Sequence, residues 1–599
     1  ALVYATYLGG SQAEAPHSLI VNGAGELVAM GTTSSLNFPT TAGAFDRTYN
    51  GGTRITPVGV NFLNGSDLFV SKLSATGSAL LGSTYVGGAL NDGISQKIDQ
   101  QVFNYGDEFR GEVYTDQQGN IYFASTTLSR NFPTANAQQN ALSGLQDAVV
   151  CQLNPTLAAL TWSTYLGGSG FDAARGIRVA SSGNVYVTGG TTSRNLPVSS
   201  GVLKTANNGE DGFVARFQNQ RLSRLSYLGT DRADQAYLVD IDLDENVYVM
   251  GLTFGQYPIT QNVYNNPRSG QFIHAMDANL SRTLFSTAIG SGRLQPDISP
   301  TAFMRSDCGF LYFSGWGGEN NEPPLDGGGS GIPGSSTSNL PTTNEAIRRT
   351  TNGDDYYLAI LDRGASQLLY GTFFGSPQRT NHVDGGTSRF SPDGTIYHAV
   401  CACRDNSTFP TTPGVWSNTN NGTRDDQSNQ PNTGCNNAAF KINLDALNAA
   451  YDLVPDTCGV PAQVRVTNRS QGGKRFEWLV NGQVRSSSAG QAVLTLSQPG
   501  EYTVTLKAYD PLTCKKVDSV SRKITVRDLV FKINKDTTLC PGQRLQLKAE
   551  GGMRYEWSPA RGMENPTSPT PTVSPTQTTS YTVRITSADG CVKTLSTTV

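Results

Sequence analysis

The chain has 599 residues, too many for one hydrophobic core, so we expect several domains or a repeat array. Charged residues make up only 16% of the chain and the net charge is −3, which argues against a nucleic-acid partner, since phosphate binding needs a concentrated basic surface. No run of about 18 apolar residues occurs, so we also expect no membrane-spanning helix.

Many short runs alternate polar residues with β-branched or aromatic residues, which is the period of half-buried strands. Asn184–Gly190, NVYVTGG, and Tyr502–Asp510, YTVTLKAYD, are examples. Helical heptads are absent from the sequence. These patterns predict an all-β chain.

Three short signatures recur in a fixed order over about residues 1–450, with a period of roughly 60 residues where insertions are small. The first, of the form STYLGG, occurs at Tyr4–Gly10, Gly82–Gly88, Trp162–Gly168, Leu225–Thr230, Phe285–Ser291 and Tyr370–Ser376. The second, of the form GNVYVTG, occurs at Gly25–Gly31, Gly119–Ser125, Gly183–Gly189, Glu245–Gly251, Gly309–Gly315 and Gly394–Val400. The third, of the form DAFVAKL, occurs at Asp67–Leu73, Asp147–Leu153, Asp211–Phe217, Gln271–Asp277, Tyr356–Asp362 and Ala438–Leu444.

Each copy supplies three strands, and a segment such as Arg175–Ser181, RGIRVAS, supplies a fourth. One four-stranded sheet cannot bury both of its faces, whereas sheets packed around an axis can. We therefore predict a six-bladed β-propeller, with a seven-bladed propeller or a linear β-solenoid as alternatives. Either Leu447–Val454 or Tyr4–Gly10 would complete the last blade.

The repeats resemble the SBBP family of bacterial β-propeller repeats, most clearly in the third copy. Tyr312–Gly318, His382–Phe390 and Cys435–Ile442 resemble a subgroup found in large secreted Bacteroidota proteins. The resemblance implies a propeller fold and an exported chain that is a cargo or component of the type 9 secretion route. It does not imply a reaction.

Two stretches of about 75 residues follow the repeats and repeat each other. Phe476–Trp478 returns as Tyr555–Trp557, and Gly500–Leu506 returns as Thr579–Ile585. A Trp with a Cys on either side, among short strands, is typical of an Ig-like sandwich. We predict a propeller over residues 1–452 and sandwiches over 453–527 and 528–599.

The first sandwich resembles a PKD domain, and the second resembles Ig/PKD-like modules of Bacteroidota surface proteins. Such modules usually act as spacers or stalks. Because residue 599 ends a strand-like segment without a sorting domain, we expect the natural chain to continue.

Nine cysteines are present. We predict one disulfide in each sandwich, Cys458–Cys514 and Cys540–Cys591. Each would close a loop of roughly 50 residues, worth about 3–4 kcal/mol in the loop-entropy model. Disulfides indicate an exported protein.

The other five cysteines lie in the repeats. Cys151 occupies a position where other copies carry Ser or Ala, so we expect a buried free thiol. Cys403–Cys435 would brace the insertion of the sixth copy, and Cys308–Cys401 would link neighbouring blades; exchanging Cys401 with Cys403 is an alternative. The C-x-C pair could bind metal instead, but the sequence lacks the second thiol pair of a structural zinc site.

No motif of a serine hydrolase, zinc protease, redox dithiol or P-loop occurs in the sequence. His382 and Asp384 could form a catalytic or metal-binding pair, but we favour a locally bonded turn. Asp240, Asp242 and Asp244 alternate, a spacing that can bind calcium.

For those carboxylates too we favour the structural interpretation. Asp242 takes the turn-opening place held by Asp116 and Asn22 in other copies. Ser391–Tyr397, SPDGTIY, is likewise interpreted as a blade turn rather than a sialidase Asp-box. We therefore expect no cofactor, with calcium as the one candidate, and no enzymatic activity.

Function more often lies in what the copies do not share. Passive loops are the more common interpretation of such insertions. Four insertions are not shared among the copies: Asn50–Ser66, Ala89–Arg110, Gly318–Asn339 and Ser417–Gly434.

We predict an extracellular or cell-surface protein, exported across the outer membrane, with a structural or adhesive role. The propeller would be the interaction head and the sandwiches the stalk; the partners would be other protein subunits, cell-surface glycans, the secretion machinery or further modules of the chain. The alternative is a glycan-binding or polysaccharide-active propeller. Ser519 and Thr537 match the short Asp-Ser/Thr pattern of O-glycosylation in Bacteroidota.

Overall fold

The computed structural model describes residues 4–95, 102–323, 331–377, 381–383, 388–403, 409–419, 435–444, 447–456, 459–511, 513–588 and 590–599. Over these ranges the chain is all-β, with many small antiparallel sheets and a few short 3-10 turns. None of the helices in these ranges is long and apolar enough to cross a membrane. The chain divides into two compact units, Ala1–Leu444 and Asp445–Val599, so the first unit ends before the predicted boundary at residue 452.

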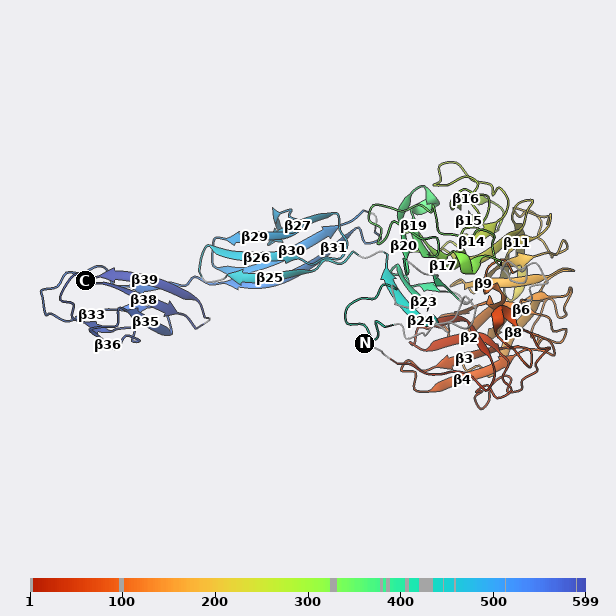
Figure 1. The fold of residues 1–599 in the computed structure, drawn as a ribbon, viewed down its shortest axis with the longest axis horizontal. Coiled ribbons are helices and arrows are strands. Elements are labelled where there is room, and N and C mark those ends of the chain that lie inside the picture. The colour runs from red at the N-terminus through yellow and green to blue at the C-terminus, as the bar shows by residue number, and fades with distance from the viewer. Residues whose placement is uncertain are drawn as a thin grey trace, which may run out of the picture. The chain divides into compact units, whose positions relative to one another are not determined.

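The N-terminal unit contains six four-stranded antiparallel sheets among its described residues (Figure 1). The first three sheets are built by β1 (Glu14–Val21), β2 (Leu27–Thr33), β3 (Asp67–Leu73) and β4 (Leu80–Val86); β5 (Glu112–Thr115), β6 (Ile121–Thr127), β7 (Asp147–Leu153) and β8 (Leu160–Leu166); and β9 (Asp172–Val179), β10 (Val185–Thr191), β11 (Asp211–Gln218) and β12 (Arg221–Leu228). The other three are built by β13 (Asp234–Ile241), β14 (Val247–Thr253), β15 (Gln271–Met276) and β16 (Thr283–Ile289); β17 (Ser299–Arg305), β18 (Leu311–Trp316), β19 (Tyr356–Leu361) and β20 (Leu368–Phe374); and β21 (Asn381–His382), β22 (Arg389–Phe390), β23 (Thr395–Cys403) and β24 (Cys435–Asn443).

The repeated signatures correspond to fixed places in these sheets. The segment predicted as a fourth strand is β9, which pairs with β10, so that prediction is confirmed. The STYLGG strand is the last strand of its sheet, since β8 pairs only with β7 within its sheet.

The first strands of successive sheets contact one another, from β1 through β5, β9, β13 and β17 to β22. Arg389 of β22 returns to the first sheet, because its Nε donates to Leu19 O at 2.7 Å and one Nη donates to Ser18 Oγ at 3.0 Å. The succession of first strands therefore closes on itself.

The turn after most STYLGG strands is held by an aspartate near the start of the next sheet, and after β20 Asn381 takes this place. Gly168 N donates to Asp172 Oδ2 at 2.8 Å, and Thr191 and Ser193 donate their hydroxyls to the same carboxylate. A side chain at Gly167 would collide with Asp147, since a Cβ there would lie 2.3 Å from the carboxylate carbon. The repeated glycines and aspartates are thus a latch between sheets.

The tyrosine of the STYLGG strand fastens a loop of its own sheet. Tyr165 is 1% exposed, accepts the N–H of Phe132 at 2.9 Å and donates to Ser129 O at 2.7 Å. Tyr85 and Tyr227 make the equivalent bonds in their sheets.

We expect Tyr165→Phe to destabilise the N-terminal unit by about 1–2 kcal/mol, because it leaves a buried N–H and a buried carbonyl without a partner. Calorimetric unfolding of the full chain measures this. Tyr397→Phe is the matched control, since Tyr397 is 50% exposed and no hydrogen bond of its hydroxyl is found among the described residues. An equal loss of stability in both variants would contradict the role of the Tyr165 hydroxyl in fastening the loop.

The sixth sheet differs from the other five. Both β21 and β22 pair with β23, and β24 pairs with β23 on its other side, so no strand of the STYLGG type belongs to this sheet among the described residues. Leu447–Val454 does not complete it, because Leu447 and Tyr451 lie in the core of the following sandwich. That alternative is wrong.

The second unit holds two separate cores. The first sandwich consists of β25 (Tyr451–Asp456), β26 (Ala462–Asn468), β27 (Arg475–Val480), β28 (Gln483–Ser486), β29 (Gln491–Leu496), β30 (Gly500–Tyr509) and β31 (Val517–Val526). The second consists of β32 (Lys532–Ile533), β33 (Leu545–Gln546), β34 (Ala549–Glu550), β35 (Arg554–Ser558), β36 (Met563–Glu564), β37 (Thr572–Val573), β38 (Ser580–Thr586) and β39 (Val592–Thr598). Trp478 and Trp557 are buried at matching places, and each indole N–H donates to a serine carbonyl at 3.0 Å.

The cysteines follow the predicted pattern only in part. Cys151 is a buried free thiol, as expected, and burial raises its pKa to about 12. Cys514 is disulfide-bonded, while its predicted partner Cys458 lies outside the described residues. The Cys540–Cys591 prediction is wrong, because Cys591 is disulfide-bonded whereas Cys540 is an exposed free thiol.

The pairing predicted within the repeats also needs correction. Cys308 is disulfide-bonded, but not to Cys401. Cys403 and Cys435 face each other in the register of β23 and β24. Their predicted disulfide stays a prediction, since their side chains lie outside the description.

Candidate functional site

All four insertions are joined to described strands at one end of the N-terminal unit. In an antiparallel sheet built in chain order, the link from second to third strand and the link to the next sheet leave from the same end. Three insertions link the second strand of a sheet to its third: Asn50–Ser66, Gly318–Asn339 and Ser417–Gly434. The fourth, Ala89–Arg110, links the first sheet to the second. We call this the insertion end, and the opposite end, which holds the short links, the turn end.

The insertion before β5 is packed against the sheets. Its described parts are 89–95 and 102–110, and the second includes the 3-10 turn η3 (Asp107–Phe109), in which all three residues are buried. Asp107 is 0% exposed, and its Oδ2 accepts the backbone N–H of Asn104 at 2.8 Å and the hydroxyl of Tyr237 in β13. A carboxylate from one insertion is therefore bound by the fourth sheet.

Two arginines complete the surroundings of Asp107. Arg110 forms an ion pair with Asp107 at 3.1 Å and donates to Pro300 O and Ser299 Oγ of β17, each at 2.9 Å. Arg175 of β9 donates to Asp107 O at 3.3 Å. The guanidinium carbons of Arg110 and Arg175 lie 5.1 and 5.0 Å from the ring centroid of Tyr237.

This cluster joins the third, fourth and fifth sheets through one insertion. Burial, followed by the charge of Asp107, raises the pKa of Tyr237 well above its ordinary value. The four side chains of Asp107, Arg110, Arg175 and Tyr237 are each at most 4% exposed, so they can position the loop but cannot reach a dissolved substrate.

The insertion before β19 meets the same cluster. Asn321, the last residue of the 3-10 turn η4 (Glu319–Asn321), is 0% exposed. Its side-chain Oδ1 accepts the N–H of Tyr105 at 2.9 Å, and its side-chain Nδ2 donates to Asn104 Oδ1 at 3.1 Å and Ser335 Oγ at 3.0 Å.

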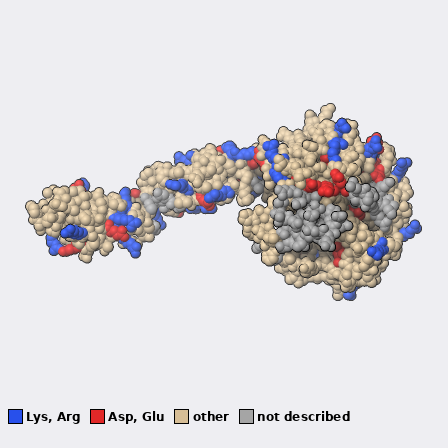
Figure 2. Space-filling view, in the orientation of Figure 1, with Lys and Arg blue, Asp and Glu red and all other residues tan. Residues whose placement is uncertain are grey.

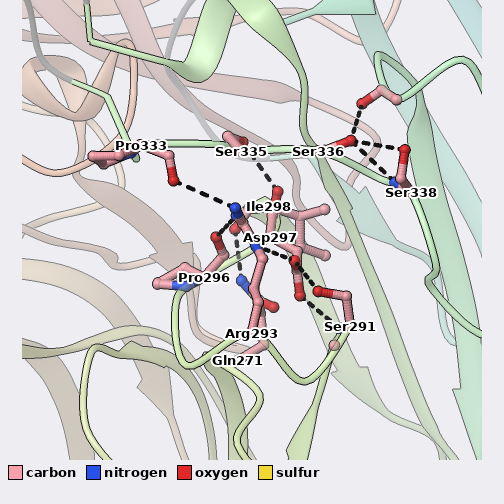
Figure 3. Close-up of polar contacts among 12 residues, drawn as sticks. Gln271, Ser291, Arg293, Pro296, Asp297, Ile298, Pro333, Ser335, Ser336 and Ser338 are labelled. Atoms are coloured by element: carbon pink, nitrogen blue, oxygen red, sulfur yellow. Dashed lines mark hydrogen bonds and ion pairs between the residues drawn. The ribbon is translucent and has the colours of Figure 1, made fainter.

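A second anchor holds this insertion to the sheets (Figure 3). Arg293 pairs with Asp297 at 2.7 Å and also donates to Pro333 O at 3.3 Å. The main-chain carbonyl of Asp297 accepts the hydroxyl of Ser335 and the N–H of Ser336. Residues 331–338 are therefore fixed against the start of β17.

The insertion after β2 contributes apolar contacts. Phe62, Ile94 and Phe109 form one buried cluster, and the Phe62 and Phe109 rings lie 5.9 Å apart. Three insertions from the first, second and fifth sheets thus converge through buried contacts between their described parts. Whether they bind a partner or are passive loops stays a prediction.

Beside these buried contacts the insertion end carries an open pocket of about 300 Å³. It is lined by Thr53, Leu90, Asn91, Leu128, Arg130, Leu142, Gly144 and Leu145. Leu90 and Leu145 are 42% and 64% exposed. Apolar side chains beside a guanidinium and an amide suit a partner with an apolar body and an acidic group.

In the view of Figure 2, most of the surface of the N-terminal unit is neither acidic nor basic; acidic side chains gather near its middle, and Lys and Arg side chains lie scattered toward its outline. A surface of this kind favours contact by shape and hydrogen bonds over long-range electrostatic attraction.

Nearer the turn end, charges from four first strands pair with one another. Glu112 binds Arg178 at 2.7 Å and Arg389 at 3.0 Å, and Asp240 binds Arg178 at 3.3 Å. Asp240 also accepts the N–H of Arg305 at 2.7 Å. These charges neutralise one another and hold the ring of first strands together.

Two of the three calcium candidates, Asp240 and Asp242, accept hydrogen bonds from protein donors, while Asp244 is exposed. Asp242 caps its turn, since Oδ1 accepts the N–H groups of Asp244 and Asn246. Asp116 binds its turn in the same way. The geometry therefore favours the turn interpretation, and no group of three metal-ligating side chains is found in the described ranges.

His382 lies in an aromatic environment. It is 2% exposed, its Nδ1 pairs with Asn320 at 2.8 Å, and its ring lies 5.6 Å from Tyr105 and 6.0 Å from Trp316. Asp384, its predicted partner, lies outside the described residues. For the other three histidines, His17, His274 and His398, burial lowers the pKa to about 3, 4 and 3.

The two predicted glycan acceptors are accessible. Ser519 is exposed on β31, and Thr537 is exposed between β32 and β33. Their modification stays a prediction.

No family model matches the chain, and no curated protein matches it. Similar solved structures include a protein of unknown function from Dyadobacter fermentans, 14% identical, with a TM-score of 0.31, covering 53% of this chain and 74% of that one. Others are a xylan β-1,4-xylosidase from Bacillus halodurans, 11% identical, with a TM-score of 0.25 and 87% and 91% covered, and the eight N-terminal Ig domains of Down Syndrome Cell Adhesion Molecule, 10% identical, with a TM-score of 0.16 and 91% and 93% covered. Likenesses this low carry no argument about fold or function.

Proposed function

We propose that this chain is an exported surface or appendage protein without enzymatic activity. Its N-terminal unit would be a six-bladed propeller of SBBP-like repeats that binds a partner at the insertion end, and its sandwiches would serve as a stalk. The number of sheets, their order in the sequence and the succession of first strands support the propeller. Sequence alone supports the SBBP resemblance and the type 9 route.

One observation carries the proposal: the unshared insertions converge through buried contacts, with Asp107 at their centre. A propeller enzyme needs an open site where acidic or basic side chains reach the substrate. Here the acidic and basic side chains of the central cluster bind one another instead. The insertions are therefore better suited to present a fixed outer surface than to perform a reaction.

Disulfides support the exported location. Cys308, Cys514 and Cys591 are disulfide-bonded, and such bonds persist mainly outside the reducing cytosol.

The enzymatic alternative is tested by incubating the purified chain with a panel of plant, animal and bacterial polysaccharides and measuring released reducing ends. We expect no turnover above a heat-denatured control. Turnover that is lost on heating would overturn the proposal and favour the polysaccharide-active alternative.

A further inference from the structure

Lys204 lies against a buried carboxylate at the start of β11. Its Nζ is 2.7 Å from Asp211 Oδ2; the side chain of Asp211 is 0% exposed and that of Lys204 is 22% exposed. Lys204 belongs to the link between β10 and β11, and Asp211 is the first residue of β11. An amine and a carboxyl group are therefore held together within one short stretch of the chain.

Both ends of Lys204 are held in place. Its N–H donates to Ser226 Oγ and its carbonyl accepts the N–H of Tyr227, each at 3.1 Å. At the other end of the side chain, Nζ also donates to Thr230 O at 3.0 Å. The amine is thus fixed beside Asp211 by contacts to the following strand and turn.

A second buried carboxylate approaches Asp211 from the junction to the next sheet. A Cβ on Gly229 would lie 2.6 Å from Asp211 Oδ1 and 2.7 Å from Asp234 Oδ2, so both carboxylates lie against this glycine. Asp234 is 1% exposed, and burial raises its pKa to about 6. Burial also raises the pKa of Asp211. Asp211 therefore has an amine beside one oxygen and a second acid near the other.

The same place in two other copies carries side chains that cannot react with the carboxylate. Gln139 and Arg348 take the place of Lys204 in the second and fifth sheets, because their carbonyls accept the matching N–H of the fourth strand. Gln139 donates to Asp147 Oδ2 at 2.7 Å, and Arg348 forms an ion pair with Asp355. A guanidinium keeps its proton in proteins, and an amide nitrogen carries no free amine. Of the three, lysine alone supplies a nucleophile.

We propose that Lys204 and Asp211 become joined by an amide bond between Nζ and Cγ, which the folded chain forms without another enzyme. The ammonium gives a proton to the Asp211 carboxylate, and the neutral amine then attacks Cγ. Asp234 takes the second amine proton and passes it to the departing hydroxyl. The Nζ–Cγ bond forms, one Cγ–O bond breaks and one water leaves. An ammonium and a carboxylate thus yield an amide and water, with no oxidant or cofactor.

The fold supplies what this reaction lacks in water. Burial favours the neutral amine and the neutral acid over the charged pair. Groups held in a reactive geometry can reach effective concentrations of about 10⁵–10⁸ M, which makes a slow bimolecular condensation unimolecular. The product would fasten the link of residues 204–211 covalently at the insertion end.

Peptide mapping of the full chain tests the bond. The purified, folded chain is incubated at neutral pH, then denatured, reduced and digested with trypsin. An unlinked chain is cleaved after Lys204 and gives Asn195–Lys204 and Thr205–Arg216. We expect instead a single peptide, Asn195–Arg216, lighter by one water than its unmodified form, with fragment ions that place the bond between Lys204 and Asp211. A chain kept unfolded in urea should not form it.

Two variants test the roles of the reacting groups. Lys204→Arg keeps a cation beside Asp211 and should give no linked peptide. Asp234→Asn keeps an acceptor for the N–H of Thr230 but cannot carry the proton, so the linked fraction should fall at least tenfold. Asp172→Asn is the matched control, because Asp172 holds the equivalent place in the preceding junction, and it should leave the linked fraction unchanged.

Complete cleavage after Lys204 in the wild-type chain would overturn the proposal, whether or not the variants fold. Loss of one water with Lys204 still cleaved would also overturn it, since that marks a succinimide at Asp211-Gly212 instead. Equal linkage in the wild-type chain and in Asp234→Asn would overturn the part assigned to Asp234.

Discussion

Replacing Asp107 by alanine is expected to destabilise the N-terminal unit by about 3–5 kcal/mol, which is the cost of breaking a buried ion pair from one side. The substitution leaves the charge of Arg110 buried, since this side chain is 4% exposed. It also removes the acceptor of the Tyr237 hydroxyl and of the Asn104 N–H.

Calorimetric unfolding of the full chain measures this effect, with the transitions of the sandwiches as an internal reference. Asp244→Ala is the matched control, because this carboxylate is exposed in a turn and its loss should change stability by less than about 0.5 kcal/mol. If Asp107→Ala lowers the free energy of unfolding of the N-terminal unit by less than about 1 kcal/mol, the insertion does not hold the sheets together.

The second large effect is a loss of stability with rising pH. Asp67 and Asp92 lie on either side of Gly87, whose Cβ would be 2.5 Å from the first carboxylate and 3.0 Å from the second. Burial raises their pKa values to about 8 and about 7. Both groups therefore hold a proton in the folded chain at pH values where the unfolded chain has released it.

A raised pKa of this kind contributes stability that is lost as pH rises through the folded value. From pH 6.5 to pH 8.5 we expect the free energy of unfolding to fall by about 3 kcal/mol, at about 1.4 kcal/mol per pH unit for each proton retained. Below pH 6.5 the buried histidines begin to oppose this trend, because their lowered pKa values make folding less favourable in acid.

Urea unfolding at several pH values between 6.5 and 8.5 measures the slope. Asp67→Asn should flatten it, because the amide keeps an acceptor for the Asn50 N–H, which donates to Asp67 at 2.7 Å, but does not titrate. Stability that stays constant or increases over this range in the wild-type chain would contradict the raised pKa values.

The repeated strands could be predicted from sequence because their signals are local. Alternation identifies β10, and the repeated glycine pair such as Gly167-Gly168 marks the end of the STYLGG segment, without any knowledge of the fold. The bond from Gly168 N to Asp172 is known only from the structure. The sequence predicts that Arg175–Ser181 supplies a fourth strand in its copy, but only the structure shows that this strand, β9, is the first of its sheet. The sequence also predicts that Asp242 opens a turn, because Asp116 and Asn22 occupy the same place in other copies.

The central cluster could not be predicted because its contacts join copies that are far apart in sequence. Asn104 and Tyr237 are separated by 133 positions, and Tyr105 and Asn321 by 216. The one available signal was the mixture of aromatic and charged residues around Asp107 within an insertion otherwise taken for a loop. Cys540 was mispaired because spacing alone does not bring two thiols within bonding distance.

The most direct test of the proposed function compares binding by variants at the two ends of the N-terminal unit. Fluorescently labelled full chain is added to cells of the strain that encodes it, and bound label is measured by flow cytometry. Leu90→Asp and Leu145→Asp alter the pocket at the insertion end, whereas Leu243→Asp alters a side chain that is 98% exposed in a turn at the opposite end.

The account predicts saturable binding by the wild-type chain and by Leu243→Asp, and at least tenfold weaker binding by Leu90→Asp and Leu145→Asp. Equal binding by all four proteins, or no binding by the wild-type chain, would contradict it.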